Sequence, residues 1–244
     1  MALNIIVSGA AGHMGRIVCE KVEADPDLTL VGSVDPFGES MYDSVSSVES
    51  GADVVIDFSH HEGTGELLDS CIEKGIPVVL CTTGQTPEEL EMIDKAAEKI
   101  PVFRSANMSV GVALVAKLVE EAASRFRGSE IEILEAHHNR KVDAPSGTAI
   151  MLADAAKKAR PKAEYIEGRS GHHKREKNEI GISSIRMGNI VGMHEVMLGT
   201  DTQTITIKHE AHDRALFADG ALDAAKFLAG KEPGMYNMDD LLAE

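Results

Sequence analysis

The chain has 244 residues, of which 43% are hydrophobic and 26% are charged, a composition typical of a folded globular protein. Its formal net charge is −16, and no lysine or arginine lies between Lys21 and Lys74. A surface that binds nucleic acid needs positive charge, so we expect a small-molecule partner and no nucleic acid.

The cysteines and the N-terminal residues bear on the compartment. Cys19, Cys71 and Cys81 are widely spaced and form no CxxC pair, which predicts neither a disulfide framework nor a zinc site. The first residues lead directly into an apolar, strand-like run without the pattern of a signal peptide, and no apolar run approaches about 18 residues. We therefore expect no membrane association and a cytoplasmic location.

Short apolar runs alternate with helical patterns from residue 3 to residue 104. The runs are nearly continuous in valine, isoleucine and leucine, which is typical of strands in a parallel sheet that is covered on both faces. One helix start is marked by a capping box, Thr86-Pro-Glu-Glu89, with proline at the first helical position. The expected strands are 3–7, 28–34, 54–58, 77–80 and 102–104, and the expected helices are 14–24, 66–74 and 87–99.

A glycine-rich turn, Gly9-Ala-Ala-Gly12-His-Met-Gly15, joins the first expected strand to the first expected helix. Glycines can adopt positive φ and let backbone N–H groups approach a pyrophosphate, whose charge the helix N-terminus favours. Tight strand–helix turns also use glycine for packing alone, so the turn by itself is weak support for a nucleotide site.

Asp35 strengthens the interpretation as a nucleotide site. It ends the second expected strand, twenty positions after Gly15, where a dinucleotide-binding fold places the carboxylate that accepts the ribose hydroxyls. Together the two features predict a nicotinamide cofactor. A carboxylate repels a 2′-phosphate, and no lysine or arginine follows Asp35 before Lys74, so we expect NADH to be preferred over NADPH. Arg16 is the one nearby cation that could reverse this preference.

The pattern changes in the second half of the chain. A helix is expected over 110–125, a strand over 131–134 and a helix over 149–158. Runs at 180–187, 194–198 and 203–209 are separated by glycine, asparagine and aspartate turns, which predicts a mixed or antiparallel sheet. Residues 168–179 are polar and basic and predict a mobile loop, and 213–229 predicts a further helix.

These elements predict an α/β protein with two domains. The first is a Rossmann-type, doubly wound parallel sheet over residues 1–107, completed by residues 213–244. The second is a smaller α+β domain over residues 108–212 with an open mixed sheet, which we expect to bind substrate.

A run of polar residues from Glu135 to Thr148 follows the strand at 131–134, and we interpret it as a functional loop. Lys141 supplies positive charge, and Ser146-Gly147-Thr148 opens a helix whose N-terminal N–H groups and positive dipole end suit a dianionic substrate. A histidine of the pair His137-His138 can donate a proton. Spacing does not say which imidazole acts, because adjacent residues leaving a strand point to opposite sides.

The chain closely resembles the dihydrodipicolinate reductase family over essentially its whole length. The most specific match is His137-His138-x-x-Lys141-x-Asp143-Ala-Pro-Ser-Gly-Thr148. Further matches lie at residues 9–16, 57–59, 82–84, 106–112, 190–192, 217–220 and 227–231. Three departures from the family pattern are Pro36, Cys81 and Met108. Many relatives have a basic residue in place of Pro36, so the resemblance also implies a preference for NADH. Relatives have glycine at the position of Cys81 and often an aromatic residue at that of Met108.

The resemblance implies an enzyme that uses NADH or NADPH to reduce the cyclic imine formed from 4-hydroxy-tetrahydrodipicolinate, giving tetrahydrodipicolinate in lysine and diaminopimelate biosynthesis. It implies that His137 is the acid/base, that Lys141 is a proton donor, and that the assembly is a homotetramer formed through the second sheet. The substrate-binding residues would be His138, Gly147 and Thr148. The cofactor-binding residues would be Gly9, Ala10, Ala11, Gly12, His13, Met14, Asp35, Cys81, Thr82, Thr83, Ser105, Ala106, Asn107 and Met108.

Three alternative functions fit the sequence less well. Another imino- or amino-acid dehydrogenase would share the nucleotide domain but not the His-His-Lys loop. A non-catalytic dinucleotide sensor should show a partner-binding module, and the sequence shows none. A metal enzyme is suggested by the pairs at 60–61, 137–138 and 172–173, but these lack spaced ligands and carboxylate support, so no metal is expected. We expect the histidines at 60–61 and 172–173 to be solvated.

Overall fold

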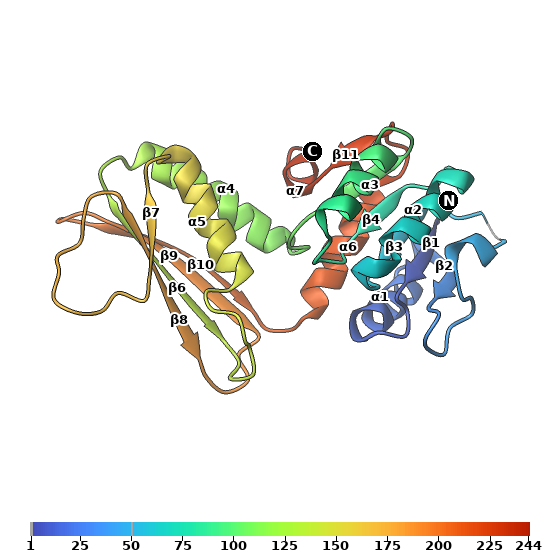
Figure 1. Cartoon of the computed structure of the whole chain (residues 1–244), viewed down its shortest axis with the longest axis horizontal. Coiled ribbons are helices and arrows are strands. Elements are labelled where there is room, and N and C mark those ends of the chain that lie inside the picture. The colour runs from blue at the N-terminus through green and yellow to red at the C-terminus, as the bar shows by residue number, and fades with distance from the viewer. Residues whose placement is uncertain (1, 50) are drawn as a thin grey trace. The chain divides into compact units, whose positions relative to one another are not determined.

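A computed structural model describes residues 2–49 and 51–244. The chain divides into two compact units, each with its own sheet and helices (Figure 1). The first unit consists of Met1–Ser109 and Ala215–Glu244, and the second is the uninterrupted segment Val110–Arg214.

In the described part of the chain, the first unit contains a six-stranded sheet in which every strand pair is parallel. In sheet order the strands are β11 (Gly234–Tyr236), β5 (Pro101–Arg104), β4 (Val78–Leu80), β3 (Val54–Asp57), β1 (Leu3–Ser8) and β2 (Leu28–Val34). The helices are α1 (His13–Ala24), α2 (Thr64–Lys74), α3 (Pro87–Ala97), α6 (Ala215–Leu228) and α7 (Met238–Leu241), with 3₁₀ turns η1 (Val45–Ser47) and η2 (His61–Gly63).

Both faces of this sheet are covered, as the apolar strands require. Helices α2 and α3 pack against each other and cover one face with Leu67, Leu68 and Ile93. Helices α1 and α6 pack against each other, and α6 contacts β3, β4 and β5. The strand order changes direction at β1, which lies between β2 and β3. Ligands of open parallel sheets bind at such a switch point, beyond the carboxyl ends of the strands.

The second unit contains a mixed sheet of five strands among the residues described, in the order β10-β9-β6-β8-β7. The strands are β6 (Glu130–His137), β7 (Glu164–Glu167), β8 (Glu179–Arg186), β9 (Gly192–Gly199) and β10 (Thr204–Ala211). Strands β6, β8 and β7 are parallel, whereas β9 is antiparallel to both β6 and β10.

Helices α4 (Val110–Arg125) and α5 (Gly147–Ala159) pack on one face of this second sheet. That face buries Ile131 and Ile133 of β6 with Val196 and Leu198 of β9. Because side chains alternate along a strand, the opposite face presents the intervening residues. Its apolar members are Leu134, Ile185, Met193 and Met197.

The predicted fold class is confirmed, and most predicted elements are present within a few residues of their expected bounds. One boundary prediction was wrong at a position that matters for the site. Strand β6 does not end at residue 134 but continues through Glu135 to His137, because buried partners satisfy these polar side chains. Strands β7 and β11 and helix α7 were not predicted, since each is only three or four residues long.

No helix within residues 2–49 and 51–244 has both the length and the apolar composition needed to cross a membrane.

Candidate active site

The glycine turn of the first unit has a backbone that requires glycine at two positions. Gly9 has φ of 76°, and a Cβ atom on it would lie 2.5 Å from the Phe58 carbonyl oxygen. A Cβ atom on Gly15 would lie 2.0 Å from the Gly9 carbonyl oxygen. Helix α1 begins after Gly12 without a side-chain cap, so its first N–H groups are not used by a capping side chain. Such a turn fits the pyrophosphate of a dinucleotide.

Asp35 follows β2 and lies beside this turn. Its Oδ2 accepts a hydrogen bond from the Ala11 N–H at 3.1 Å, and its Oδ1 accepts one from the Phe37 N–H at 3.0 Å. The two features singled out in the sequence as a dinucleotide site are therefore in direct contact. The hydroxyl groups of a ribose bound at the turn could donate hydrogen bonds to this carboxylate.

A pocket of about 360 Å³ lies in the first unit at the ends of β3 and β4 and the start of α1. Thr82 donates a hydrogen bond from its hydroxyl to Asp57 Oδ2 at 2.6 Å. Asp57 is almost fully buried, and burial raises its pKa, against the opposing effect of donors from Ser59, Thr82 and Ser8. The lining residues are Met14, Phe58, Ser59, His60, His61, Cys81, Thr82 and Thr83.

His61 differs from its expected description as a solvated histidine. Its side chain is only 25% exposed, and its Nδ1 lies 3.0 Å from Glu89 Oε2. Glu89 also closes the predicted capping box of α3, accepting from the Thr86 N–H at 2.7 Å. This polar contact thus connects the pocket wall to a helix N-terminus.

The remaining residues expected to bind the cofactor occupy two places. His13 is the first residue of α1, while residues 105–108 connect β5 to α4 and are not among those lining the pocket. In that connection the Ser105 hydroxyl donates to the Asn107 carbonyl at 2.8 Å, and Met108 is buried. Ala106 is exposed.

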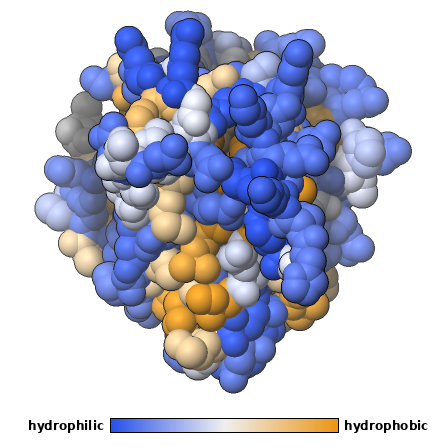
Figure 2. Space-filling view, turned by 90° about the vertical axis from the view of Figure 1, so that its left-hand side faces the viewer, coloured by the Kyte–Doolittle hydropathy of each residue, from blue (hydrophilic) through white to orange (hydrophobic). Residues whose placement is uncertain are grey.

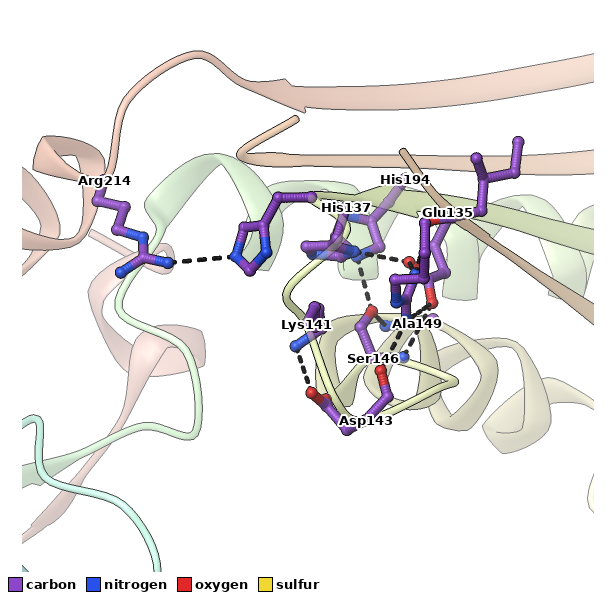
Figure 3. A network of polar contacts seen from close by, with 11 residues as sticks. Glu135, His137, Lys141, Asp143, Ser146, Ala149, His194 and Arg214 are labelled. Atoms are coloured by element: carbon purple, nitrogen blue, oxygen red, sulfur yellow. Dashed lines mark hydrogen bonds and ion pairs between the residues drawn. The ribbon is translucent and has the colours of Figure 1, made fainter. Parts of the chain in front are cut away.

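In the second unit, His137 forms a close pair with a carboxylate that the sequence analysis did not assign to the site. Glu135 and His137 are two residues apart on β6, so they lie on the same face of the sheet. His137 Nδ1 lies 2.6 Å from Glu135 Oε2, and Glu135 has no exposed surface. Figure 3 shows this pair within a network of polar contacts from several elements.

Further residues donate hydrogen bonds to the Glu135 carboxylate. Arg186, on β8, donates to Oε2 at 2.8 Å and to Oε1 at 2.7 Å, and the Ser146 N–H donates to Oε1 at 3.2 Å. Burial alone would raise the pKa of Glu135, but hydrogen bonds from Arg186, Ser184 and His137 outweigh it and lower the pKa to about 2. Glu135 is therefore a buried anion at neutral pH.

His194, on β9, completes the network. Its ring meets that of His137 edge to face at a centroid distance of 5.1 Å, and its Nε2 lies 3.0 Å from the Ser146 hydroxyl. The same hydroxyl accepts from the Ala149 N–H at 3.2 Å and caps α5. Burial, followed by the neighbouring His137, lowers the pKa of His194 to about 4, so this ring is neutral at physiological pH.

The other residues expected to act on substrate lie around this network. Lys141 is in the loop after β6, with its ammonium 2.8 Å from Asp143 Oδ1. His138 Nε2 lies 3.4 Å from an Arg214 guanidinium nitrogen, and burial, then Arg140 and Arg214, lower its pKa. Gly147 and Thr148 are the first two residues of the thirteen-residue helix α5.

Arg186 and His194 were missed as members of the site, and Glu135, which begins the predicted functional loop, was given no role there. The sequence did contain a signal for His194. It alternates with Val196 and Leu198 on the buried side of its strand, and a buried imidazole is expected to have a hydrogen-bond partner. In the described chain, no group of three or more histidine, cysteine or acidic residues is arranged to hold a metal ion.

Comparisons with known proteins agree with this geometry. A model of the dihydrodipicolinate reductase N-terminus matches residues 3–108, and a model of the dihydrodipicolinate reductase C-terminus matches residues 111–242. The chain belongs to the dihydrodipicolinate reductase family. Two reductases of this family named 4-hydroxy-tetrahydrodipicolinate reductase are each 45% identical to it. That of Caldanaerobacter subterraneus matches 99% of both chains, and that of Clostridium tetani matches 99% of this chain and 98% of its own.

A solved dihydrodipicolinate reductase has the same fold. The dipicolinate-bound enzyme from Paenisporosarcina sp. TG-14 superposes with a TM-score of 0.82 at 23% identity, covering 97% of this chain and 98% of its own. A probable dehydrogenase from Thermotoga maritima is more distant, with a TM-score of 0.62 at 13% identity over 98% of this chain and 92% of its own.

Proposed function

We propose that this protein is a 4-hydroxy-tetrahydrodipicolinate reductase, which reduces the cyclic imine derived from that compound to tetrahydrodipicolinate in lysine and diaminopimelate biosynthesis. The proposal rests on one observation above all: relatives of that name match the chain at 45% identity over 99% of its length. Both the nucleotide turn and the histidine network lie inside the matched range.

The first unit is proposed to hold a nicotinamide dinucleotide, which when bound supplies the hydride. The glycine turn and the uncapped start of α1 suit its pyrophosphate, and Asp35 suits its ribose. The pocket at Met14 and Cys81–Thr83 is proposed for a further part of the cofactor. Gly9–Met14 and Ser105–Met108 complete the proposed contacts.

We infer that NADH is preferred over NADPH. The Asp35 carboxylate already lies against the Ala11 N–H, and a 2′-phosphate next to it would meet like charge. We expect kcat/KM to be higher with NADH than with NADPH, and Asp35→Ser combined with Pro36→Arg to reverse the order. An equal or higher kcat/KM with NADPH in the wild type contradicts this preference.

The second unit is proposed to bind a dicarboxylate. Helix α5 begins at Gly147 and Thr148, where its first N–H groups and positive dipole end favour a carboxylate. Lys141 and Arg214 add positive charge close to His138. His138, Gly147 and Thr148 are proposed to bind the substrate, and His137 and Lys141 to supply the proton that follows hydride transfer.

The function is tested by oxidation of NADH and of NADPH with substrate made in situ from pyruvate and aspartate semialdehyde by the preceding synthase. Substrate-dependent oxidation supports the proposal. A protein that binds NADH but oxidises it with neither this imine nor any other would instead be a dinucleotide sensor. Turnover confined to a different imino acid would favour another dehydrogenase.

We also propose a homotetramer assembled through the second sheet. The face of that sheet opposite its helices presents Leu134, Ile185, Met193 and Met197. The side of the molecule viewed in Figure 2 shows hydrophobic residues gathered in its lower half among hydrophilic ones. Contiguous apolar surface of this kind marks interaction sites. Sedimentation of the wild type should give a tetramer, and Ile185→Glu should give smaller species; a monomeric wild type contradicts the proposal.

A further inference from the structure

The network around Glu135 goes beyond the residues to which the proposed function gives roles. Glu135 receives donors from three elements: Arg186 of β8, His137 of its own strand and the Ser146 N–H at the start of α5. It lies opposite Ser184 on β8 and opposite His194 on β9. Glu135 is fully buried, and burying an ionised carboxylate costs its hydration free energy. Its hydrogen-bond and ion-pair partners must compensate for that cost.

The charge state of Glu135 determines which nitrogen of His137 carries hydrogen. An ionised carboxylate only accepts hydrogen bonds, and the bidentate Arg186 guanidinium keeps Glu135 ionised. At 2.6 Å from Oε2, His137 Nδ1 must therefore be the donor. The neutral imidazole then has its lone pair on Nε2.

We propose that Glu135 is a positioning residue that fixes His137 in the Nδ1–H tautomer and orients its Nε2 as the nitrogen that exchanges a proton with the substrate. This inference rests on the proposed function for the role of His137. The Nε2–H bond of the imidazolium breaks as the proton passes to the substrate, and the neutral ring that remains is the tautomer Glu135 stabilises. The next proton is taken up at the same nitrogen from water.

The surroundings of the ring are consistent with this role. A Cβ atom on Gly192 would lie only 3.2 Å from His137 Nε2, so glycine at this position leaves space beside that nitrogen. His194 meets the ring edge to face and stays neutral, so it adds no positive charge against the imidazolium. Its bond to the Ser146 hydroxyl links the ring to the start of α5.

A structural ion pair on the same sheet provides a matched control. Glu179, at the other end of β8, pairs with Arg169 at 2.6 Å, and its side chain is 10% exposed. Glu179→Gln therefore removes a carboxylate–arginine pair from the sheet without touching a histidine. If Glu135 served only to stabilise the sheet, Glu135→Gln and Glu179→Gln would have similar consequences.

The tautomer is measured directly in free protein labelled with ¹⁵N-histidine, using long-range ¹H–¹⁵N spectra and His137→Asn to assign the ring. In the wild type we expect hydrogen on Nδ1 of neutral His137. In Glu135→Gln we expect the Nε2–H tautomer to become populated, because the Gln amide can donate to Nδ1; Glu179→Gln should keep the wild-type signal. A wild-type ring with hydrogen on Nε2, or an unchanged ring in Glu135→Gln, overturns the proposal.

Kinetics then test whether the tautomer matters for turnover. Glu135→Gln should lower kcat by about 10²-fold or more, with KM for the imine and for NADH changed by less than about threefold. Glu179→Gln should keep kcat near the wild-type value. Normal kcat in Glu135→Gln overturns the positioning role. If the wild type shows the expected tautomer but does not turn over this imine, the result contradicts the proposed function and not the positioning role of Glu135.

Discussion

Lys141 and Lys158 lie in the same unit but are expected to differ in their effect on catalysis. Both ammonium groups are held by a carboxylate, Lys141 by Asp143 at 2.8 Å and Lys158 by Glu120 at 3.0 Å. Lys141 is largely buried beside the histidine network, whereas Lys158 is exposed on α5. Exposed ion pairs contribute little to stability, so the difference should appear in catalysis.

Replacing Lys141 by alanine is expected to lower kcat by about 10²-fold or more without loss of the fold, because a proposed proton donor and a positive charge are removed. Steady-state kinetics and circular dichroism on the variant measure the two effects. Lys158→Ala, which removes an exposed lysine of the same unit, should behave as the wild type. A near-normal kcat for Lys141→Ala would remove this residue from the proposed proton donors.

Glu135 should also make the stability of the protein depend on pH. Its pKa is lowered from 4.5 to about 2 in the folded protein, so the unfolded chain takes up its proton first as the pH falls. The stabilisation from Glu135 is therefore present at neutral pH and is lost as the pH falls from 4.5 toward 2. The acid dependence of the unfolding free energy, measured by denaturant titration, should be shallower in Glu135→Gln than in the wild type.

A matched control for the acid series is Glu121→Gln, which removes an exposed carboxylate paired with Arg125 on α4. We expect its stability to follow the wild-type pH dependence. An identical slope in Glu135→Gln and the wild type would mean that Glu135 is not held as an anion in the folded state.

At the scale of elements, two helices share one type of N-cap hydrogen bond but lie in different surroundings. Ser146 caps α5 and Thr86 caps α3, each accepting a backbone N–H at 3.2 Å. Only the Ser146 hydroxyl also contacts an imidazole, that of His194. Substitutions at the two caps can therefore be compared to separate the effect of a cap on helix stability from its effect on the arrangement of the site.

Ser146→Ala and Thr86→Ala should each lower the unfolding free energy by about 1 kcal/mol, since each removes one N-cap bond. Ser146→Ala should in addition lower kcat/KM for the imine by about tenfold or more, because the start of α5 and His194 lose their common partner. Thr86→Ala should leave kcat/KM for the imine close to that of the wild type. Equal kcat/KM in both variants would show that the cap contributes only stability.

The elements also show what sequence patterns can and cannot predict. Strands β1 to β5 of the first sheet are mainly apolar runs, and the glycine turn and Asp35 have a recognisable local spacing, so all of these could be predicted. Glu135 and Arg186 are charged residues inside strands, and only their contact across the sheet explains their burial. Strand β11 forms through pairing with β5, far away in the sequence, and its three residues carry no pattern of their own.

At the scale of the whole molecule, the two units differ in how the chain builds them. The second unit is one continuous segment with its own apolar core, while the first needs both ends of the chain. We propose these as the two domains. A fragment of residues 110–214 should show a cooperative unfolding transition by circular dichroism. A fragment of residues 1–109 lacks α6 and β11 and should not; a non-cooperative 110–214 fragment contradicts the division.

The two-segment construction of the first unit has a consequence for synthesis. Helix α6 packs on β3, β4, β5 and α1, yet it leaves the ribosome only after the whole second unit has been translated. In the nascent chain, β3, β4 and β5 therefore lack the cover of α6 on one face of the apolar parallel sheet while the second unit already has all its residues. Chaperone capture during translation should be strongest in that interval and should end once α6 emerges.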